Sequence, residues 1–214
     1  EARFVIEHIQ ALIEKGAARS DIAILYRSNA QSRVFEERLL ACAIPYRVYG
    51  GLRFFERQEI KDALAYLRLC ANREDDASFD RIVNHPPRGI GERTLGAVRD
   101  RARLDQSSLW AAALAVQQED SLNARARNAL AAFTRAMDTL AEDIDPLDLA
   151  EQVEHLVQCA GLKDHYAKEK GEKGQARLEN LDELVNAARE FDYESEDDEE
   201  LDSVTAFLSH AALE

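Results

Sequence analysis

Residues 84–95 read Asn-His-Pro-Pro-Arg-Gly-Ile-Gly-Glu-Arg-Thr-Leu, and this stretch constrains the fold on both sides of it. Its two prolines end any preceding helix, because proline lacks an N–H and restricts the residue before it. The Gly-Ile-Gly that follows predicts a tight turn, since glycine accepts a positive φ without steric cost. A helix is expected from Glu92 to Arg103, where good helix formers follow an acidic first residue. The stretch therefore predicts a helix-hairpin-helix-like arrangement.

The predicted turn is a candidate phosphate site. Backbone N–H groups at a helix N-terminus have no intrahelical partner, so they attract anions. Residues 81–103 hold six arginines and two acids, in a chain whose formal net charge is −14. The plain alternative is an ordinary turn between helices, and Gly-x-Gly alone is weak evidence. The local charge favours a phosphate of a nucleic-acid backbone. The candidate residues are Arg88, Gly89, Ile90, Gly91, Arg93 and Thr94.

The composition describes a globular protein of one or two domains. The chain has 214 residues, of which 46% are hydrophobic, so it can bury a core. No run of about 18 apolar residues is present, so we expect no transmembrane helix and no membrane partner. The negative net charge argues against a nucleic-acid footprint over the whole surface. A local footprint stays open, because phosphate contacts act within about 10 Å.

The cysteines and histidines do not suggest a metal site. Cys42, Cys70 and Cys159 are far apart and form no Cys-x-x-Cys pair, and the five histidines lack the spacing of metal-binding motifs. Reduced, buried thiols in the cytoplasm are expected instead. The chain opens without Met or a signal-peptide pattern, and residues 204–214 read as an uncapped helix, so we expect a piece of a larger protein.

Residues 1–63 predict a small α/β unit. Strands are expected near 21–27 and 45–49, where short apolar runs occur, and a helix is expected at 34–43 between them. Such a strand, helix and strand within about thirty residues form a βαβ-type unit. Three polar side chains follow the first strand, at the end where open α/β sheets bind ligands. These candidate residues are Arg27, Asn29 and Arg33. The sequence equally supports solvated arginines and an asparagine that only caps a helix.

The rest of the chain is predicted to be all-helical, so the fold class is mixed α/β but predominantly α-helical. Apolar spacing predicts helices at 59–71, 92–103, 109–116, 122–142, 147–159 and 178–191. Asp75 or Asp76 is expected to cap one helix, and Ser108 another. Pro146 is expected at the first position of the helix that follows it.

Two further stretches have a plain and a functional interpretation. Phe54 and Phe55 lie beside arginines and can stack bases, but we expect these rings to fill the core under a loop. Residues 192–202 hold eight acids and no base, which predicts a solvated, mobile loop rather than a competitor of DNA for a basic face.

Several long segments resemble the UvrD/PcrA/Rep-type helicases. Residues 23–33, Ala-Ile-Leu-Tyr-Arg-Ser-Asn-Ala-Gln-Ser-Arg, resemble part of their second RecA-like domain, called 2A. Residues 44–46 and 50–62, the latter reading Gly-Gly-Leu-Arg-Phe-Phe-Glu-Arg-Gln-Glu-Ile-Lys-Asp, extend that likeness. Residues 87–91, together with Thr94, resemble the glycine hairpin of the mobile domain 2B. Further 2B-like segments are residues 168–173 and 179–184. The resemblance covers nearly the whole chain, and its motifs are long and specific.

The resemblance implies part of a superfamily 1A helicase that translocates 3′ to 5′ and unwinds DNA in repair. ATP and Mg²⁺ are then cofactors of the intact protein, its partners are single-stranded and duplex DNA, and repair proteins are candidate partners. Residues 1–63 would be the first part of 2A and residues 64–214 most of 2B. Rotation of 2B would control whether the intact enzyme unwinds.

The resemblance also assigns site residues. Arg27 and Asn29 match positions that touch the single strand. The positions that match the hairpin on the duplex backbone are Gly89, Ile90, Gly91 and Thr94.

The ATPase residues of that family are missing from this sequence. There is no Gly-x-x-x-x-Gly-Lys-Ser/Thr phosphate loop, so the chain alone should bind no ATP and hydrolyse none. A hypothesis from a different class is a non-enzymatic helical protein-interaction module. The salt dependence of DNA binding distinguishes the two hypotheses, because affinity that depends on phosphate contacts falls steeply as the salt concentration rises.

Overall fold

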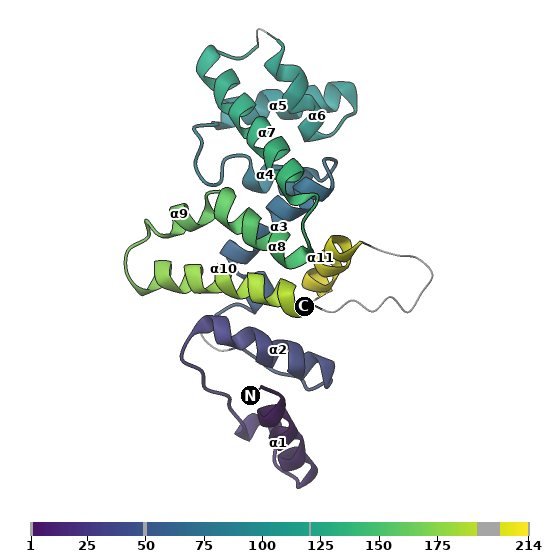
Figure 1. The fold of residues 1–214 in the computed structure, drawn as a ribbon, viewed down its shortest axis with the longest axis vertical. Coiled ribbons are helices and arrows are strands. Elements are labelled where there is room, and N and C mark those ends of the chain that lie inside the picture. Colours follow the sequence, from purple (N-terminus) through teal and green to yellow (C-terminus); the bar gives the residue numbers. More distant parts are fainter. Residues whose placement is uncertain (1, 49–50, 120, 192–201, 214) are drawn as a thin grey trace.

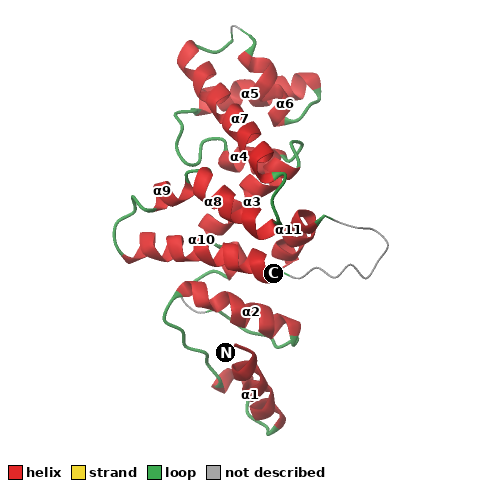
Figure 2. Cartoon of the chain, viewed as in Figure 1, coloured by secondary structure: helices red, strands yellow, loops and turns green. Residues whose placement is uncertain are grey.

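The computed structural model describes residues 2–48, 51–119, 121–191 and 202–213. Figure 2 shows helices and loops in these residues and no strand. The helices are α1 (Ala2–Glu14), α2 (Ser32–Ala41), α3 (Gln58–Ala71), α4 (Asp76–Ile82), α5 (Glu92–Asp105), α6 (Leu109–Gln117), α7 (Ala124–Ile144), α8 (Leu149–Cys159), α9 (Leu162–Tyr166), α10 (Glu172–Glu190) and α11 (Ser203–Leu213). Short 3₁₀ turns are η1 (Arg19–Asp21), η2 (Asn29–Gln31) and η3 (Phe54–Glu56).

The hydrophobic core consists of two separate clusters. The smaller cluster has Ile6, Ile9 and Leu39 at its centre and comes from α1 and α2. The larger cluster takes buried residues from every helix between α3 and α11. Figure 1 shows α1 and α2 at one end of the long axis and α5, α6 and α7 at the other. The predicted boundary at residue 63 falls inside α3, whose buried apolar side chains belong to the larger cluster, and the division into two domains stays a prediction.

Helix α10 is the part of the larger cluster that lies next to α2 (Figure 1). It packs against α3, α8 and α9 of the larger cluster, and it also contacts η2, the turn that leads into α2. In Figure 1, α10 lies directly above α2 and below α8. The two candidate sites therefore lie on opposite sides of α10: the turn that holds Asn29 borders α2, and the glycine hairpin precedes α5.

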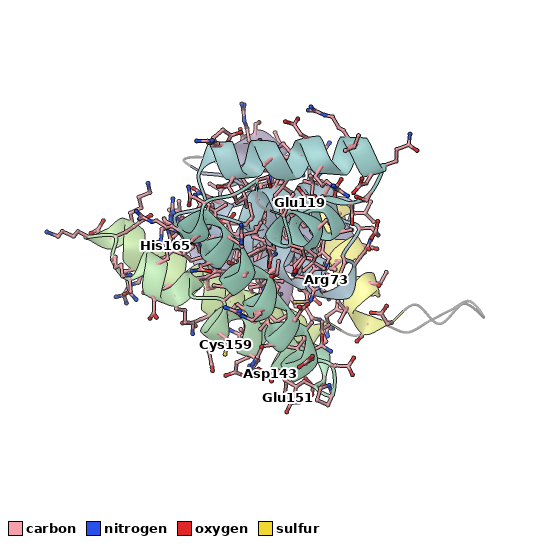
Figure 3. All side chains as sticks on the ribbon, turned by 90° about the horizontal axis from the view of Figure 1, so that it is seen from above. Arg73, Glu119, Asp143, Glu151, Cys159 and His165 are labelled. Carbon is pink, nitrogen blue, oxygen red and sulfur yellow. The ribbon has the colours of Figure 1, made fainter. Side chains whose placement is uncertain are left out.

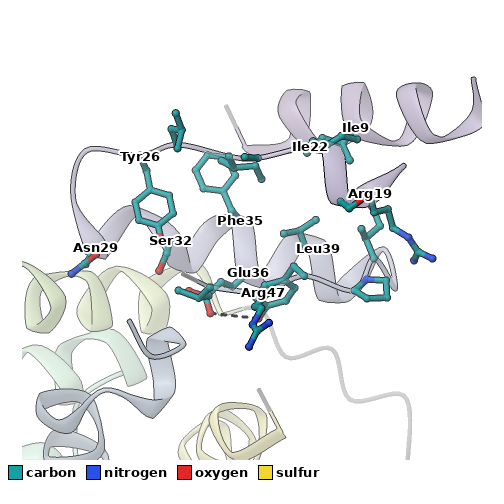
Figure 4. A pocket seen from close by; sticks show the side chains of 18 residues that line it. Ile9, Arg19, Ile22, Tyr26, Asn29, Ser32, Phe35, Glu36, Leu39 and Arg47 are labelled. Carbon is teal, nitrogen blue, oxygen red and sulfur yellow. Dashed lines mark hydrogen bonds between the residues drawn. The ribbon is translucent and has the colours of Figure 1, made fainter. Parts of the chain in front are cut away.

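The predicted strands near 21–27 and 45–49 are not present among the described residues. Residues 22–26 and 44–48 run as extended chain but form no strand. Tyr49 lies outside the described residues. A strand needs a neighbour to accept its backbone hydrogen bonds. In this part of the chain the two segments line opposite walls of an open cleft of about 620 Å³ instead of pairing (Figure 4). Leu25 is accordingly 94% exposed.

Local signals set most helix ends. Asp75 caps α4 by accepting a hydrogen bond from the Ser78 N–H at 2.9 Å, and Ser108 caps α6, as the sequence predicted. The start of α8 was predicted wrongly, because Pro146 lies before the helix and not at its first position. Asp148 caps α8 instead, in a capping box with Glu151.

The aromatic pair is confirmed as core, and the thiol environment needs correction. Phe54 and Phe55 are both buried and pack edge-to-face. Cys42 and Cys70 are only partly buried, and Cys159 is exposed on α8 (Figure 3), so the expectation of buried thiols is wrong for these residues. Residues 192–201 of the predicted acidic loop lie outside the described residues.

Candidate nucleic-acid interface

The glycine hairpin between α4 and α5 is ordered by one asparagine side chain. The Asn84 Oδ1 atom accepts hydrogen bonds from the Arg88 N–H at 2.8 Å and from the Ile90 N–H at 3.2 Å. Gly89 has a φ of +73°, which favours glycine. Ile90 is 1% exposed and anchors the turn in the larger cluster. The buried Ile90 side chain leaves the glycines on either side of it exposed.

The hairpin presents backbone N–H groups that have no protein partner within the described residues. These belong to Gly89, Gly91, Glu92 and Arg93. Gly91 is the N-cap of α5 and offers no side-chain cap, and its carbonyl accepts from the Thr94 and Leu95 N–H groups. The Glu92 carboxylate pairs with Arg99 at 2.5 Å. The N-terminal end of α5 therefore combines uncapped donors, a positive dipole end and a partly neutralised acid, which suits a phosphate oxygen.

The positive charge around the hairpin is largely used within the protein. Of the six arginines in residues 81–103, only Arg93 has no ion pair or hydrogen bond from its guanidinium among the described residues. Arg88 turns inward: it donates to the carbonyls of Ile82 and Pro86 and to the Tyr66 hydroxyl. Arg88 therefore stabilises the conformation of the hairpin. Arg93 is the arginine of this segment whose guanidinium is available to a ligand. Thr94 is buried in the first turn of α5.

A buried polar cluster supports the hairpin from below. Asp62 on α3 accepts a hydrogen bond from Arg81 Nε at 2.7 Å and from the Tyr166 hydroxyl at 2.7 Å. The His85 Nε2 atom lies 3.0 Å from the same carboxylate. Tyr66 donates to the His85 carbonyl at 2.7 Å. Helices α3, α4 and α9 and the hairpin thus meet at one carboxylate.

Titration in this cluster follows its hydrogen bonds. Burial alone would raise the pKa of Asp62, but the hydrogen bonds from His85 and Tyr166 and the charge of Arg81 outweigh burial and hold the pKa below its usual value. Burial and the neighbouring charge of His85 lower the pKa of His165, whose ring lies 4.7 Å from that of His85. His165 lies at the α9 edge of the molecule (Figure 3). An ionised Asp62 and a neutral His165 are the expected state near neutral pH.

The second candidate site divides into exposed and buried residues. Arg27 and Asn29 are exposed, on the segment that enters η2. They line one wall of a cleft of about 940 Å³, and the first turns of α10, including Lys173, line the other. Figure 4 shows Asn29 at the end of the extended segment that begins at Ile22. Both side chains are placed to meet a ligand from solvent.

The third predicted residue of that site, Arg33, faces the protein interior. Its side chain is 2% exposed and contacts three carboxylates: Glu37 at 2.8 Å, Glu183 at 2.6 Å and Glu190 at 2.6 Å. Burial alone would lower the pKa of Arg33, but the hydrogen bonds that its guanidinium donates to Glu190 and Glu37 outweigh burial and raise the pKa. The structure brings Arg33 to α10 and leaves it apart from the exposed Arg27 and Asn29.

Sequence reasoning missed the residues that order the site. Asn84, Asp62 and Tyr166 were not singled out, because a side chain's partner on another helix leaves no local pattern. Only Asn84 carried a usable signal, since asparagine commonly bonds backbone N–H groups a few residues further along a turn.

Neither a metal-binding group nor a membrane-spanning helix is found among the described residues. No group of three or more histidine, cysteine, aspartate or glutamate residues there could hold a metal ion. No helix in the same ranges is long and apolar enough to span a membrane.

Comparison with known proteins places the sequence of this chain in a family. A sequence model of the UvrD-like helicase C-terminal domain matches residues 1–214. The chain is 55% identical to DNA helicase II of Escherichia coli over its whole length and 52% identical to DNA helicase II of Haemophilus influenzae. It is 41% identical to the ATP-dependent DNA helicase PcrA of Bacillus subtilis. The chain spans 28–30% of the length of these relatives.

Proposed function

The chain belongs to the family of UvrD-like helicase C-terminal domains, and from that premise we propose that it grips duplex DNA for an ATP-dependent DNA helicase. The grip is on phosphates and does not read the base sequence. Its carrying observation is the hairpin: among the described residues, the N–H groups of Gly89, Gly91, Glu92 and Arg93 and the guanidinium of Arg93 have no protein partner.

The proposal divides the work within the chain. The larger cluster, with the hairpin, is the duplex-binding 2B-type part, and the segment with Arg27 and Asn29 is part of the single-strand track of a 2A-type domain. The intact helicase is proposed to move 3′ to 5′, to act in DNA repair in the cytoplasm and to be regulated by the position of the 2B-type part. The relatives are named DNA helicase II and ATP-dependent DNA helicase PcrA, which supports the helicase class.

ATP and Mg²⁺ belong to the proposed whole enzyme, but residues of this chain do not fit the nucleotide. The sequence has no phosphate loop with its lysine and hydroxyl residue, and so no cradle for the phosphates of ATP. The chain alone is therefore expected to hydrolyse no ATP. What it contributes is the binding and placement of DNA.

Salt-dependent binding of a duplex with a single-stranded 3′ tail tests the proposal. Fluorescence anisotropy of this DNA is measured with the wild type, Arg93→Ala and Arg103→Ala between low and moderate salt. Arg103 carries the same charge at the other end of α5 and is paired with Asp100, so it is a matched control. Affinity should fall as salt rises. Arg93→Ala should reduce the slope of log K against log salt by about one, and Arg103→Ala should leave it unchanged.

Two outcomes contradict this function. If the wild type keeps its helical circular dichroism but does not bind the DNA at low salt, the chain does not bind duplex DNA as proposed. If Arg93→Ala and Arg103→Ala have equal slopes of log K against log salt, the hairpin is not the DNA-binding site. In either case a helical protein-interaction module becomes the better account of the larger cluster.

A further inference from the structure

The side chain of Arg57 lies where the two clusters meet. It is 8% exposed and comes from the residue that precedes α3. Its Nη1 atom donates to the Asn29 carbonyl and to Asn180 Oδ1, both at 2.9 Å, and Nη2 donates to Ser32 Oγ at 2.6 Å. One guanidinium thus holds η2, the first residue of α2 and helix α10.

Asn180 completes the connection on the α10 side. It is 3% exposed, and its Nδ2 atom donates to Glu59 Oε1 at 2.5 Å while its Oδ1 atom accepts from Arg57. The Glu59 carboxylate also lies 3.7 Å from Arg177 Nε. Both ends of the Asn180 amide are therefore fixed. A buried network of this kind is stable only when all its members are paired, because each unpaired member carries a desolvation cost.

Other contacts between the α2 side and α10 are polar as well. Ser28 donates to Glu179 on α10, and Arg33 contacts Glu183 and Glu190 further along that helix. The apolar clusters on the two sides are not continuous. A seam joined by hydrogen bonds and ion pairs can open without exposing a large apolar face, so its two sides can shift relative to each other.

We propose that Arg57 and Asn180 are positioning residues that couple the turn at Arg27 and Asn29 to helix α10. Single-strand binding at the turn then tightens the first half of α10, and displacement of α10 loosens the turn, since such coupling is reciprocal. Arg57 itself is not proposed to contact DNA, because its guanidinium donates its hydrogen bonds to acceptors within the protein. The functional half of this inference rests on the proposed single-strand contact.

Hydrogen exchange measured by mass spectrometry tests the coupling without DNA. Arg57→Lys keeps the charge but loses the fork that reaches two partners at once. Arg73→Lys is the matched control: Arg73 donates to the carbonyls of Leu69 and Met137 and lies over the Trp110 ring, all within the larger cluster. Arg57→Lys should speed exchange about tenfold in residues 27–33 and 175–185 and leave α5, α6 and α7 unchanged. Arg73→Lys should leave both of those segments unchanged.

Asn180→Ala provides a second route, because it removes the α10 side of the connection and leaves Arg57 in place. It should speed exchange in residues 27–33 as well. The coupling is overturned if residues 27–33 are unaffected in both variants, or if Arg57→Lys speeds exchange uniformly through α3–α8, as loss of a merely structural residue would.

A labelled oligothymidylate separates this inference from the proposed function. In the wild type, oligothymidylate should slow exchange in residues 27–33 and 175–185, and in Arg57→Lys it should slow only residues 27–33. Slowing of both segments in Arg57→Lys overturns the coupling. If the wild type binds no oligothymidylate but the exchange result without DNA holds, the single-strand contact fails and the coupling of the turn to α10 stands.

Discussion

Asp62 shows how a single buried carboxylate can decide the geometry of an exposed turn. Its oxygens meet Arg81, Tyr166 and His85, which come from α4, α9 and the hairpin. Hydrogen bonds to a charged group are among the stronger ones in proteins. The hairpin is held in place by this carboxylate and by Arg88, while the N–H groups of its glycines and the Arg93 guanidinium have no protein partner in the described part of the chain.

Replacement of Asp62 by asparagine should change stability in a pH-dependent way. The folded-state pKa of Asp62 is depressed, so its stabilising effect is complete above the unfolded-state pKa of about 3.9 and is lost as pH falls through the folded value. Above pH ~5, Asp62→Asn should lower the free energy of unfolding by about 2 kcal/mol. Thermal unfolding of both proteins, followed by circular dichroism from pH ~6 down to pH ~3, measures the difference, which should shrink below pH ~4. A constant difference across that range would mean that Asp62 is not ionised in the cluster.

At the scale of elements, local chemistry accounts for the parts of the structure that were predictable. The caps at Asp75 and Ser108 and the turn at Gly89 depend on neighbouring residues, and the sequence was sufficient for them. The segment at residues 22–26 has strand composition, but it has no partner among the described residues and stays extended.

Long-range partners account for the site residues that were not predictable. Arg33 and Arg88 look like phosphate ligands in sequence, yet carboxylates on α10 and carbonyls of the hairpin occupy them. The α10 carboxylates lie 150 and 157 residues from Arg33 in the sequence, and the Tyr66 hydroxyl that Arg88 also meets lies 22 residues away, so no local pattern indicates these partners. Arg27 and Arg93, which have similar sequence surroundings, are the ones left exposed.

Close packing at the corner between α9 and α10 requires a glycine. A Cβ atom on Gly174 would collide with the Glu169 carbonyl oxygen and lie 3.0 Å from the Tyr166 carbonyl oxygen, and backbone atoms cannot move aside cheaply. Gly174→Ala should lower the free energy of unfolding by about 3 kcal/mol, as overpacked sites do. Gly96→Ala on α5 is the control: a Cβ there meets nothing within 4 Å, and alanine in a helix interior should stabilise by up to about 1 kcal/mol. Denaturant midpoints of the two variants should move in opposite directions, and equal midpoints would contradict the packing argument.

At the scale of the whole molecule, the two clusters differ greatly in size. The smaller one depends on Ile6, Ile9 and Leu39 and borders an open cleft, whereas the larger one draws on every helix from α3 to α11. A small cluster beside an open cleft buries less apolar surface and is expected to open at lower free energy. The polar seam at α10 then sets how strongly the two parts unfold together.

Calorimetry should accordingly resolve two thermal transitions. Ile9→Ala should lower the midpoint temperature of the first transition, because it removes a buried side chain of the smaller cluster. The free energy of unfolding of that cluster should fall by about 2–4 kcal/mol. Phe133→Ala should lower the temperature of the second transition, because it removes a fully buried side chain of the larger cluster. The free energy of unfolding of that cluster should fall by about 3–5 kcal/mol. One transition that both variants shift equally would show that the molecule unfolds as a single unit.

Uncapped N–H groups of the hairpin are proposed to hold a DNA phosphate, and Gly91→Ser is a substitution that would compete with that phosphate. Gly91 has the extended backbone of an ordinary N-cap, with a φ of −85° and a ψ of 167°, and a Cβ there meets no atom within 4 Å. A serine hydroxyl should therefore cap α5 and occupy the N–H groups that a phosphate would use, while changing stability by only a few tenths of a kcal/mol. We predict that Gly91→Ser keeps its unfolding midpoint and binds the tailed duplex about tenfold more weakly in anisotropy titrations at low salt. Unchanged affinity in a folded Gly91→Ser protein would contradict the account, because the hairpin would then be a structural turn.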